Sequence, residues 1–197
     1  SNPAGSVKIK NILKADFFNN LGQKSFYLGG FFLTSALPIS ALLFLFSIFL
    51  SFSDKATIQY KDKYNLVLLV AAILMIFKNI FFDLPKDFDN ENIRMIMWLD
   101  LINWIPFFIF FIGFQKYLTN SMRRIKFSKF LIAGSIPFFI SCILQSWFNL
   151  YGPYETLNGL IIWFQKPISE NHQGITGLFS NQNYAGLWLT AILPLLI

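Results

Sequence analysis

The sequence predicts an all-α polytopic membrane protein with about five transmembrane helices, the last one incomplete at the chain end, and a short interfacial helix. Apolar residues make up 55% of the 197 residues and charged residues only 13%, whereas soluble domains carry about 25% charged residues. Several apolar runs reach about 20 residues, the length that a helix needs to cross a bilayer. The basic residues gather in short loops between these runs, where they set orientation in the membrane, so no nucleic-acid partner is expected.

Residues 1–28 form a separate N-terminal segment in this prediction. Lys8, Lys10, Lys14 and Lys24 alternate with apolar residues at helical spacing, which is typical of a basic amphipathic helix on an anionic membrane surface. A flexible tail is the alternative. No cleavable signal peptide is expected, because the apolar run that follows is too long for one.

Residues 29–197 form the predicted transmembrane domain. Each expected span is long enough to cross a hydrocarbon core of about 30 Å. Pro38 is expected to kink the first span, and Pro137 lies inside the fourth. The spans are expected at 29–53, 65–84, 95–114 and 130–150, followed by the truncated helix 184–197.

The segment 151–182 joins the fourth span to the last helix. Leu157, Leu160, Ile161 and Phe164 in this segment fall on one face of a helix. The run is too short to span a bilayer, so an interfacial helix is expected here.

Loop charges predict the sidedness. Loop 54–64 has three lysines, and loop 115–129 has five basic residues and no acidic one. Both should be cytoplasmic by the positive-inside rule, and segment 151–182, with Lys166 as its one basic residue, should face outward. Four spans then put the basic N-terminus outside, against the same rule. Either the N-terminal segment is translocated, or 29–53 is a re-entrant hairpin bent at Pro38.

Polar residues within the predicted spans cluster towards the outer side. Lys78, Asp100, Asn103 and Gln145 lie at similar predicted depths. Charges cost about 2.5 to 3.5 kcal/mol each in hydrocarbon, so they are rarely left facing lipid. This clustering predicts a polar cavity that opens outward, with Lys78 paired to Asp100 or Asp83. A structural ion pair with snorkelling side chains is the alternative.

The stretch Gly177-Leu178-Phe179-Ser180-Asn181-Gln182-Asn183-Tyr184-Ala185-Gly186 is a polar turn that leads into an apolar helix. Asn or Ser here predicts a helix start, since such side chains accept hydrogen bonds from the first turn. A helix N-terminus presents N–H groups and partial positive charge, which suit a phosphate or diphosphate. An ordinary capped transmembrane helix with an aromatic belt is the alternative.

This stretch resembles the Gly-x-Phe-x-Asn-Pro-Asn segment of the bacterial O-antigen ligase and O-antigen polymerase superfamily, and the whole chain is similar in hydropathy to the N-terminal half of such a protein. Two positions depart from the pattern. Gly174 stands where the family often has Arg, which leaves no phosphate-binding Arg here, and Gln182 stands where it usually has Pro. The second departure is mild, because Pro at that place only presets the backbone.

The resemblance implies a multi-pass enzyme of the bacterial cytoplasmic membrane. Such a glycosyltransferase moves a glycan from an undecaprenyl-diphosphate donor to an acceptor glycan or lipid A core at the outer face, among membrane lipids, without a metal or cofactor. One Cys and one His also argue against a metal site.

The candidate residues of this site follow from the motif and from the polar positions in the spans. His172 is the candidate general base for the acceptor hydroxyl, with a solvated loop histidine as the alternative. The candidate substrate contacts are Lys78, Asp100, Asn103, Gln145, Gly177, Ser180, Asn181, Asn183 and Tyr184.

Two other functions stay open. In a transporter or channel fragment, Lys78, Asp100, Asn103 and Gln145 would line a permeation path from an outward-facing polar cavity, although such a path needs polar groups at several depths. In an inactive fragment, the spans would merely pack.

Overall fold

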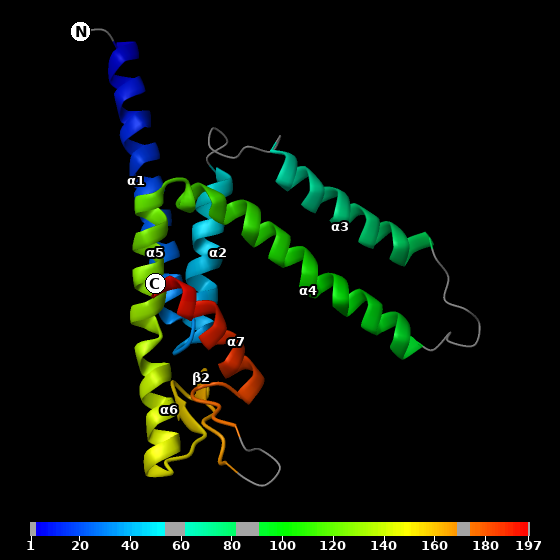
Figure 1. Cartoon of the computed structure of the whole chain (residues 1–197). Coiled ribbons are helices and arrows are strands. Elements are labelled where there is room, and N and C mark those ends of the chain that lie inside the picture. Colours follow the sequence, from blue (N-terminus) through cyan, green and yellow to red (C-terminus); the bar gives the residue numbers. More distant parts are fainter. Residues whose placement is uncertain (1–2, 54–61, 82–90, 169–173, 197) are drawn as a thin grey trace. The chain divides into compact units, whose positions relative to one another are not determined.

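The computed structural model describes residues 3–53, 62–81, 91–168 and 174–196. The chain divides into two compact units, one formed by Ser1–Leu50 with Tyr117–Ile197 and the other by Ser51–Lys116. Each unit is described by itself (Figure 1). Most of the described residues are helical, so the predicted helical class is confirmed at this level.

Unit 1 contains most of the secondary structure. Its elements, in chain order, are α1 (Pro3–Phe32), α2 (Leu37–Ser53, of which the last residues belong to unit 2), η2 (Lys116–Leu118, from its second residue), α5 (Ser121–Gly134), α6 (Ile136–Phe148), β1 (Tyr154–Thr156), β2 (Ile161–Trp163), α7 (Gln182–Ile192) and η3 (Leu193–Leu195).

Helix α1 packs along α5 in a parallel sense. The Phe26 and Phe127 rings stack with centroids 4.3 Å apart, and the Tyr27 and Phe130 rings stack at 5.5 Å. Just beyond the end of α1, Thr34 Oγ1 donates to the carbonyl of Gly134, the last residue of α5, at 2.8 Å. Residue numbers therefore rise together on the two helices, and their N-termini point to the same end of the unit.

Helix α2 folds back antiparallel on α1. Ser40 Oγ donates to the Gly29 carbonyl at 2.7 Å, and the Phe26 and Phe44 centroids are 5.8 Å apart. Fully buried Tyr117 closes the other end of this pair by donating its hydroxyl to the Ser47 carbonyl at 2.6 Å. The bundle core is thus aromatic, and the hydroxyls of Ser40 and Tyr117 are bonded to backbone carbonyls.

A break at Ser135 separates α5 from α6. Pro137 has no N–H, so it cannot complete the helical bond to the carbonyl of Ala133. Ser135 caps the interrupted turn by donating its Oγ to the Leu131 carbonyl at 2.8 Å. At the same place a Cβ on Gly134 would lie 2.0 Å from the carbonyl oxygen of Phe31, so only glycine lets the end of α1 approach α5 this closely.

The predicted first span, 29–53, was wrong in its boundaries. Helix α1 runs through positions 28 and 29 without interruption and ends at Phe32, and a turn at 33–36 leads into α2. Pro38 lies in the first turn of α2, where its missing N–H leaves no helical bond unmade. It therefore begins a second helix where a kink in one long helix was expected.

The predicted interfacial helix over 157–164 was also wrong, because the structure has a β-hairpin there. Strands β1 and β2 are antiparallel, with Tyr154 opposite Trp163. Leu157, Asn158 and Gly159 have φ angles of 53°, 55° and 82°. Asn-Gly is the pair that most readily adopts positive φ in a hairpin turn, which explains why a turn forms here.

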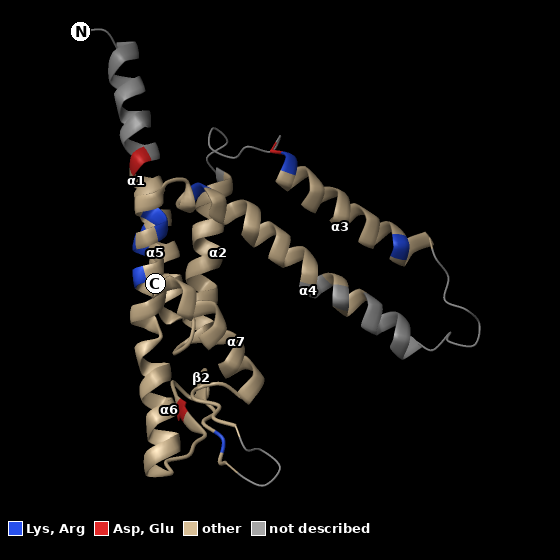
Figure 2. Ribbon diagram, in the orientation of Figure 1, with Lys and Arg blue, Asp and Glu red and all other residues tan. Residues whose placement is uncertain are grey.

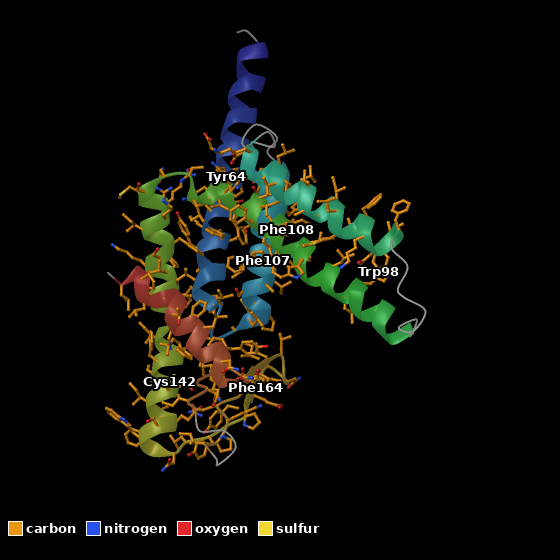
Figure 3. All side chains as sticks on the ribbon, turned by 45° about the vertical axis from the view of Figure 1, so that its right-hand side comes forward. Tyr64, Trp98, Phe107, Phe108, Cys142 and Phe164 are labelled. Carbon is orange, nitrogen blue, oxygen red and sulfur yellow. The ribbon has the colours of Figure 1, made fainter. Side chains whose placement is uncertain are left out.

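Unit 2 contains the antiparallel helices α3 (Lys63–Phe81) and α4 (Glu91–Gln115). The side-chain amides of Asn65 and Gln115 join them through two reciprocal hydrogen bonds of 2.9 and 2.7 Å. Large apolar side chains otherwise point away from the pair: Val67 and Phe81 are each 65% exposed. Figure 3 shows the aromatic side chains along both helices.

Two of the described helices are long and apolar enough to cross a membrane. They are Lys63–Phe81 and the continuous stretch Ser121–Phe148, in which α5 and α6 run on from each other. Only 6% and 22% of their apolar windows are buried, unlike the core helix of a soluble domain. The apolar helices Leu37–Phe52 and Trp104–Leu118 are shorter.

Replacing Gly134 by Ala should destabilise unit 1 by about 1 to 3 kcal/mol, because the new methyl group meets a backbone carbonyl that cannot move alone. Gly186→Ala is the matched control, since a Cβ there meets nothing within 4 Å and removing a helical glycine stabilises a helix by about 0.5 to 1 kcal/mol. Unfolding of the purified chain in detergent measures both. Equal stability of Gly134→Ala and the wild type would contradict the close approach of α1 to α5.

Candidate functional site

The side chain of Gln145 on α6 holds the segment before α7 in place. It is fully buried. Its Oε1 accepts from the backbone N–H groups of Thr176 and Gly177 at 3.0 and 2.9 Å. Its Nε2 donates to Thr176 Oγ1 at 3.2 Å and to the carbonyl of Lys166. Both donors and both acceptor sites of the amide are therefore used within the chain, which gives Gln145 a positioning role.

Gln165 fixes the same segment from a second point. It is 4% exposed, and its Nε2 donates to the carbonyls of Leu150 and Ser141 at 3.1 and 3.3 Å. Gly152 N–H donates to the Gln165 carbonyl at 2.9 Å, which ties the chain beyond α6 back to the end of the hairpin. The carbonyls of Leu150 and Gln165 and the N–H of Gly152 are thus bonded inside the protein.

Gly177 presses directly against α6. Its φ is +54°, and a Cβ would lie 2.6 Å from the Phe138 ring and 2.9 Å from Cys142 Sγ. On the other side, Phe164 N–H donates to the Leu178 carbonyl at 3.2 Å. Cys142 and Phe164, both labelled in Figure 3, therefore flank the first residues of the motif. This packing accounts for glycine at the start of the motif.

Helix α7 starts in the polar turn, as the sequence predicts, but it begins at Gln182 and not at Tyr184, with Asn181 as its N-cap. The Asn181 side chain accepts from the Asn183 N–H at 2.8 Å, the usual N-cap bond. Trp188 on the same helix donates its Nε1 to Ser135 Oγ at 3.0 Å, which holds α7 against the α5–α6 break. The cap uses one of the N–H groups that the motif was expected to offer to a phosphate.

The two departures from the family pattern touch each other. Gly174 N–H donates to Gln182 Oε1 at 2.8 Å. A Cβ on Gly174 would lie 2.3 Å from that same oxygen. Gln182 therefore occupies the place that a side chain at position 174 would need, so an Arg there is compatible only with a different residue or rotamer at position 182.

A cavity of about 370 Å³ lies where the α1–α2 turn, the hairpin and the start of α7 meet. Trp163 Nε1 donates to the Ser35 carbonyl, which fastens the hairpin to the turn. The lining is mostly apolar and carries a few hydroxyl groups. It consists of Leu33, Thr34, Ser35, Leu37, Pro38, Leu160, Ile161, Ile162, Phe164, Leu178, Phe179, Ser180 and Tyr184. We call this cavity the motif pocket.

The structure brings most of the unit 1 candidates together. Ser180 and Tyr184 line the motif pocket, Asn181 and Asn183 form the cap beside it, and Gly177 lies against α6. No Lys or Arg is among the described residues that line the pocket. Any charge stabilisation in the pocket itself therefore comes from helix α7 and from hydroxyl groups.

The remaining candidates lie elsewhere. Lys78 is exposed on α3 in unit 2. Because Asn65 faces Gln115, Lys78 lies about three and a half turns along α3, near the level of residue 102 on α4. The backbones of Asp100 and Asn103 are near this level, but their side chains and the whole of His172 lie outside the described residues, so the Lys78 pairing and the general base stay predictions.

Sequence analysis missed the part of the pocket that comes from the α1–α2 turn and the hairpin. Thr34-Ser35, placed just before Pro38 between two apolar runs, is a turn signal. Asn158-Gly159 is a hairpin signal. Neither signal shows by itself that the two segments meet at the motif.

Comparison of the chain with family models, curated proteins and solved structures finds no match. In the part of the chain that the structure describes, no group of three or more His, Cys, Asp and Glu side chains could hold a metal ion.

Replacing Gln145 by Met, which keeps the approximate volume, should release the motif from α6. The N–H groups of Thr176 and Gly177 would lose their acceptor, at a cost of about 1 to 3 kcal/mol for each buried group left unbonded. Hydrogen exchange of these two amides should accelerate at least tenfold, while Gln23→Met on α1 should leave their exchange unchanged. Unaltered protection in Gln145→Met would show that other contacts hold the loop.

Proposed function

We propose that this chain belongs to a membrane glycosyltransferase of the O-antigen ligase or polymerase type and that the motif pocket receives its polyprenyl-diphosphate-linked glycan donor. One observation carries the proposal. The segment that resembles the family contributes Leu178, Phe179, Ser180 and Tyr184 to an apolar pocket directly beside a helix N-terminus. The acceptor is a glycan or lipid A core.

The chemistry of the donor matches both parts of this arrangement. An isoprenoid chain is apolar and suits the lining from the α1–α2 turn and β2. A diphosphate suits the positive end of α7 and the hydroxyl of Ser180. Asn181 already binds the Asn183 N–H, so the diphosphate uses the helix dipole and the hydroxyls more than free N–H groups, and its counter-charge comes from residues outside the pocket lining.

The packing of α1 supports an outward-facing motif pocket. Since α1 and α5 are parallel, Lys24 lies towards the same end as Arg123 and Arg124. If α1 crosses the membrane as an additional span, the basic ends of α1 and α5 both face the cytoplasm. The conflict that four spans create with the positive-inside rule then disappears. In this proposal the protein is a multi-pass protein of the bacterial cytoplasmic membrane.

The reaction needs a base for the acceptor hydroxyl and a site for the departing diphosphate. In this proposal His172 is the base. Gly174, two residues later, is bound to Gln182 at the start of α7, which is the end of the helix where the diphosphate is proposed to sit.

Filling the motif pocket should block the donor. A photoreactive undecaprenyl diphosphate analogue should label the chain in nanodiscs, and unlabelled undecaprenyl diphosphate should compete better than undecaprenol. Ser180→Phe places a ring at the pocket and should reduce the competed labelling roughly tenfold, equivalent to about 1.4 kcal/mol. Thr190→Phe is the control, because Thr190 is exposed on α7 and does not line the pocket.

Equal labelling of Ser180→Phe and Thr190→Phe would contradict binding of the donor in the motif pocket. Equal competition by undecaprenol would show that the pocket selects the isoprenoid chain without the diphosphate, which would contradict a donor site.

A further inference from the structure

A second cavity, of about 360 Å³, lies between α1 and α5 at the opposite end of the bundle from the hairpin. Gln23 and Tyr27 line it from α1, and Arg123, Lys126 and Lys129 line it from α5. Figure 2 shows how Lys and Arg gather on α5, whereas α6 carries none. We call this cavity the basic pocket.

The polar groups of the basic pocket are held in place by bonds within the chain. Gln23 Nε2 donates to the Tyr27 hydroxyl at 2.7 Å. Lys126 Nζ lies 5.5 Å from the centroid of the Tyr27 ring, within the range of a cation–π interaction. Arg123 Nη1 donates to Thr119 Oγ1 at 3.2 Å. Gln23, Arg123 and Lys126 are therefore held in position around the pocket.

The positive charge of the basic pocket favours an anionic ligand. Three cationic side chains line it, and none of the described lining residues is acidic. Asp16, the acidic residue of α1 whose side chain is described, lies about two turns before Gln23. Guanidinium and ammonium groups together bind phosphate oxygens through charge-assisted hydrogen bonds.

The surroundings of the basic pocket are those of a membrane interface. The pocket lies at the N-terminal end of the 28-residue helical stretch Ser121–Phe148, which contains an apolar window long enough to cross a membrane. Two further lining residues, Met122 and Ile125, are 76% and 51% exposed, so apolar surface adjoins the cations. A ligand that joins a phosphate to acyl chains fits both kinds of surface, and basic pockets between helices at this level bind anionic headgroups.

We propose that the basic pocket binds the phosphate of an anionic phospholipid headgroup and thereby fixes α1 against α5 at that face of the membrane. The proposal goes beyond the glycan transfer proposed above and does not depend on it, since it requires only that the α5–α6 stretch crosses a membrane. The lipid phosphate lies among Arg123, Lys126 and Lys129, and its acyl chains pass along Met122 and Ile125.

Native mass spectrometry of the whole purified chain with defined lipids tests the proposal. The first phosphatidylglycerol should bind with a dissociation constant roughly tenfold lower than that of the first phosphatidylcholine. Lys126→Gln should abolish most of this preference, and Lys126→Arg should restore it. Arg124→Gln removes the same charge from the same turn of α5, but Arg124 does not line the pocket, so this variant should change the preference less than twofold.

If Lys126→Gln and Arg124→Gln lowered the preference for phosphatidylglycerol equally, general electrostatic attraction would explain it, and the proposed site would be overturned. Displacement of phosphatidylglycerol by inorganic phosphate at the same concentration would also overturn it, because the pocket would then be a free-phosphate site. Lys126→Gln should leave photolabelling by the undecaprenyl diphosphate analogue unchanged, so the two proposals fail independently.

Discussion

The hydrogen bonds of the Gln145 side chain are the constraint on which the rest of unit 1 depends. A long connection that lies against apolar helices must satisfy its backbone polar groups internally, since neither lipid nor an apolar core offers partners. Gln145 does this for Thr176, Gly177 and Lys166 at once. Because the amide projects from α6, it sets both the height of the motif along that helix and its distance from it. The start of α7 and the pocket beside it follow from this placement.

The two pockets lie at opposite ends of one helical frame. The α5–α6 stretch has 28 residues, which corresponds to about 42 Å and exceeds a hydrocarbon core of about 30 Å. Parallel packing of α1 and α5 places their basic residues at one end. At the other end, the turn at 33–36 contacts both the α5–α6 break and the hairpin. The apolar pocket with hydroxyl groups at one end and the cationic pocket at the other differ in the way that the two proposed lipids differ, one a glycan carrier and the other an anionic lipid of the bilayer.

The sequence was sufficient for features that depend on local composition. Apolar runs predicted helices at 65–84, 95–114 and 130–150, where α3, α4 and the end of α5 with α6 lie. The polar turn before Tyr184 predicted the start of α7, because a side-chain cap acts within one turn. The prediction for 157–164 was wrong because the apolar residues have helical spacing, whereas the Asn158-Gly159 turn makes the segment a hairpin. Gln145 was identified as a significant polar residue, but its partners lie 21 to 32 positions away in the sequence. Such partners follow from tertiary packing, which no local pattern encodes.

The central claim is that the motif pocket and the basic end of α5 lie on opposite sides of a membrane. It is tested most directly with Cys142 replaced by Ser and a single cysteine introduced at Glu155→Cys on β1 or at Arg124→Cys on α5, both exposed positions. An impermeant maleimide applied to intact spheroplasts should label the first variant, and should label the second only after permeabilisation. Labelling of both variants in intact cells, or of neither until permeabilisation, would put the two ends on one side and contradict the account.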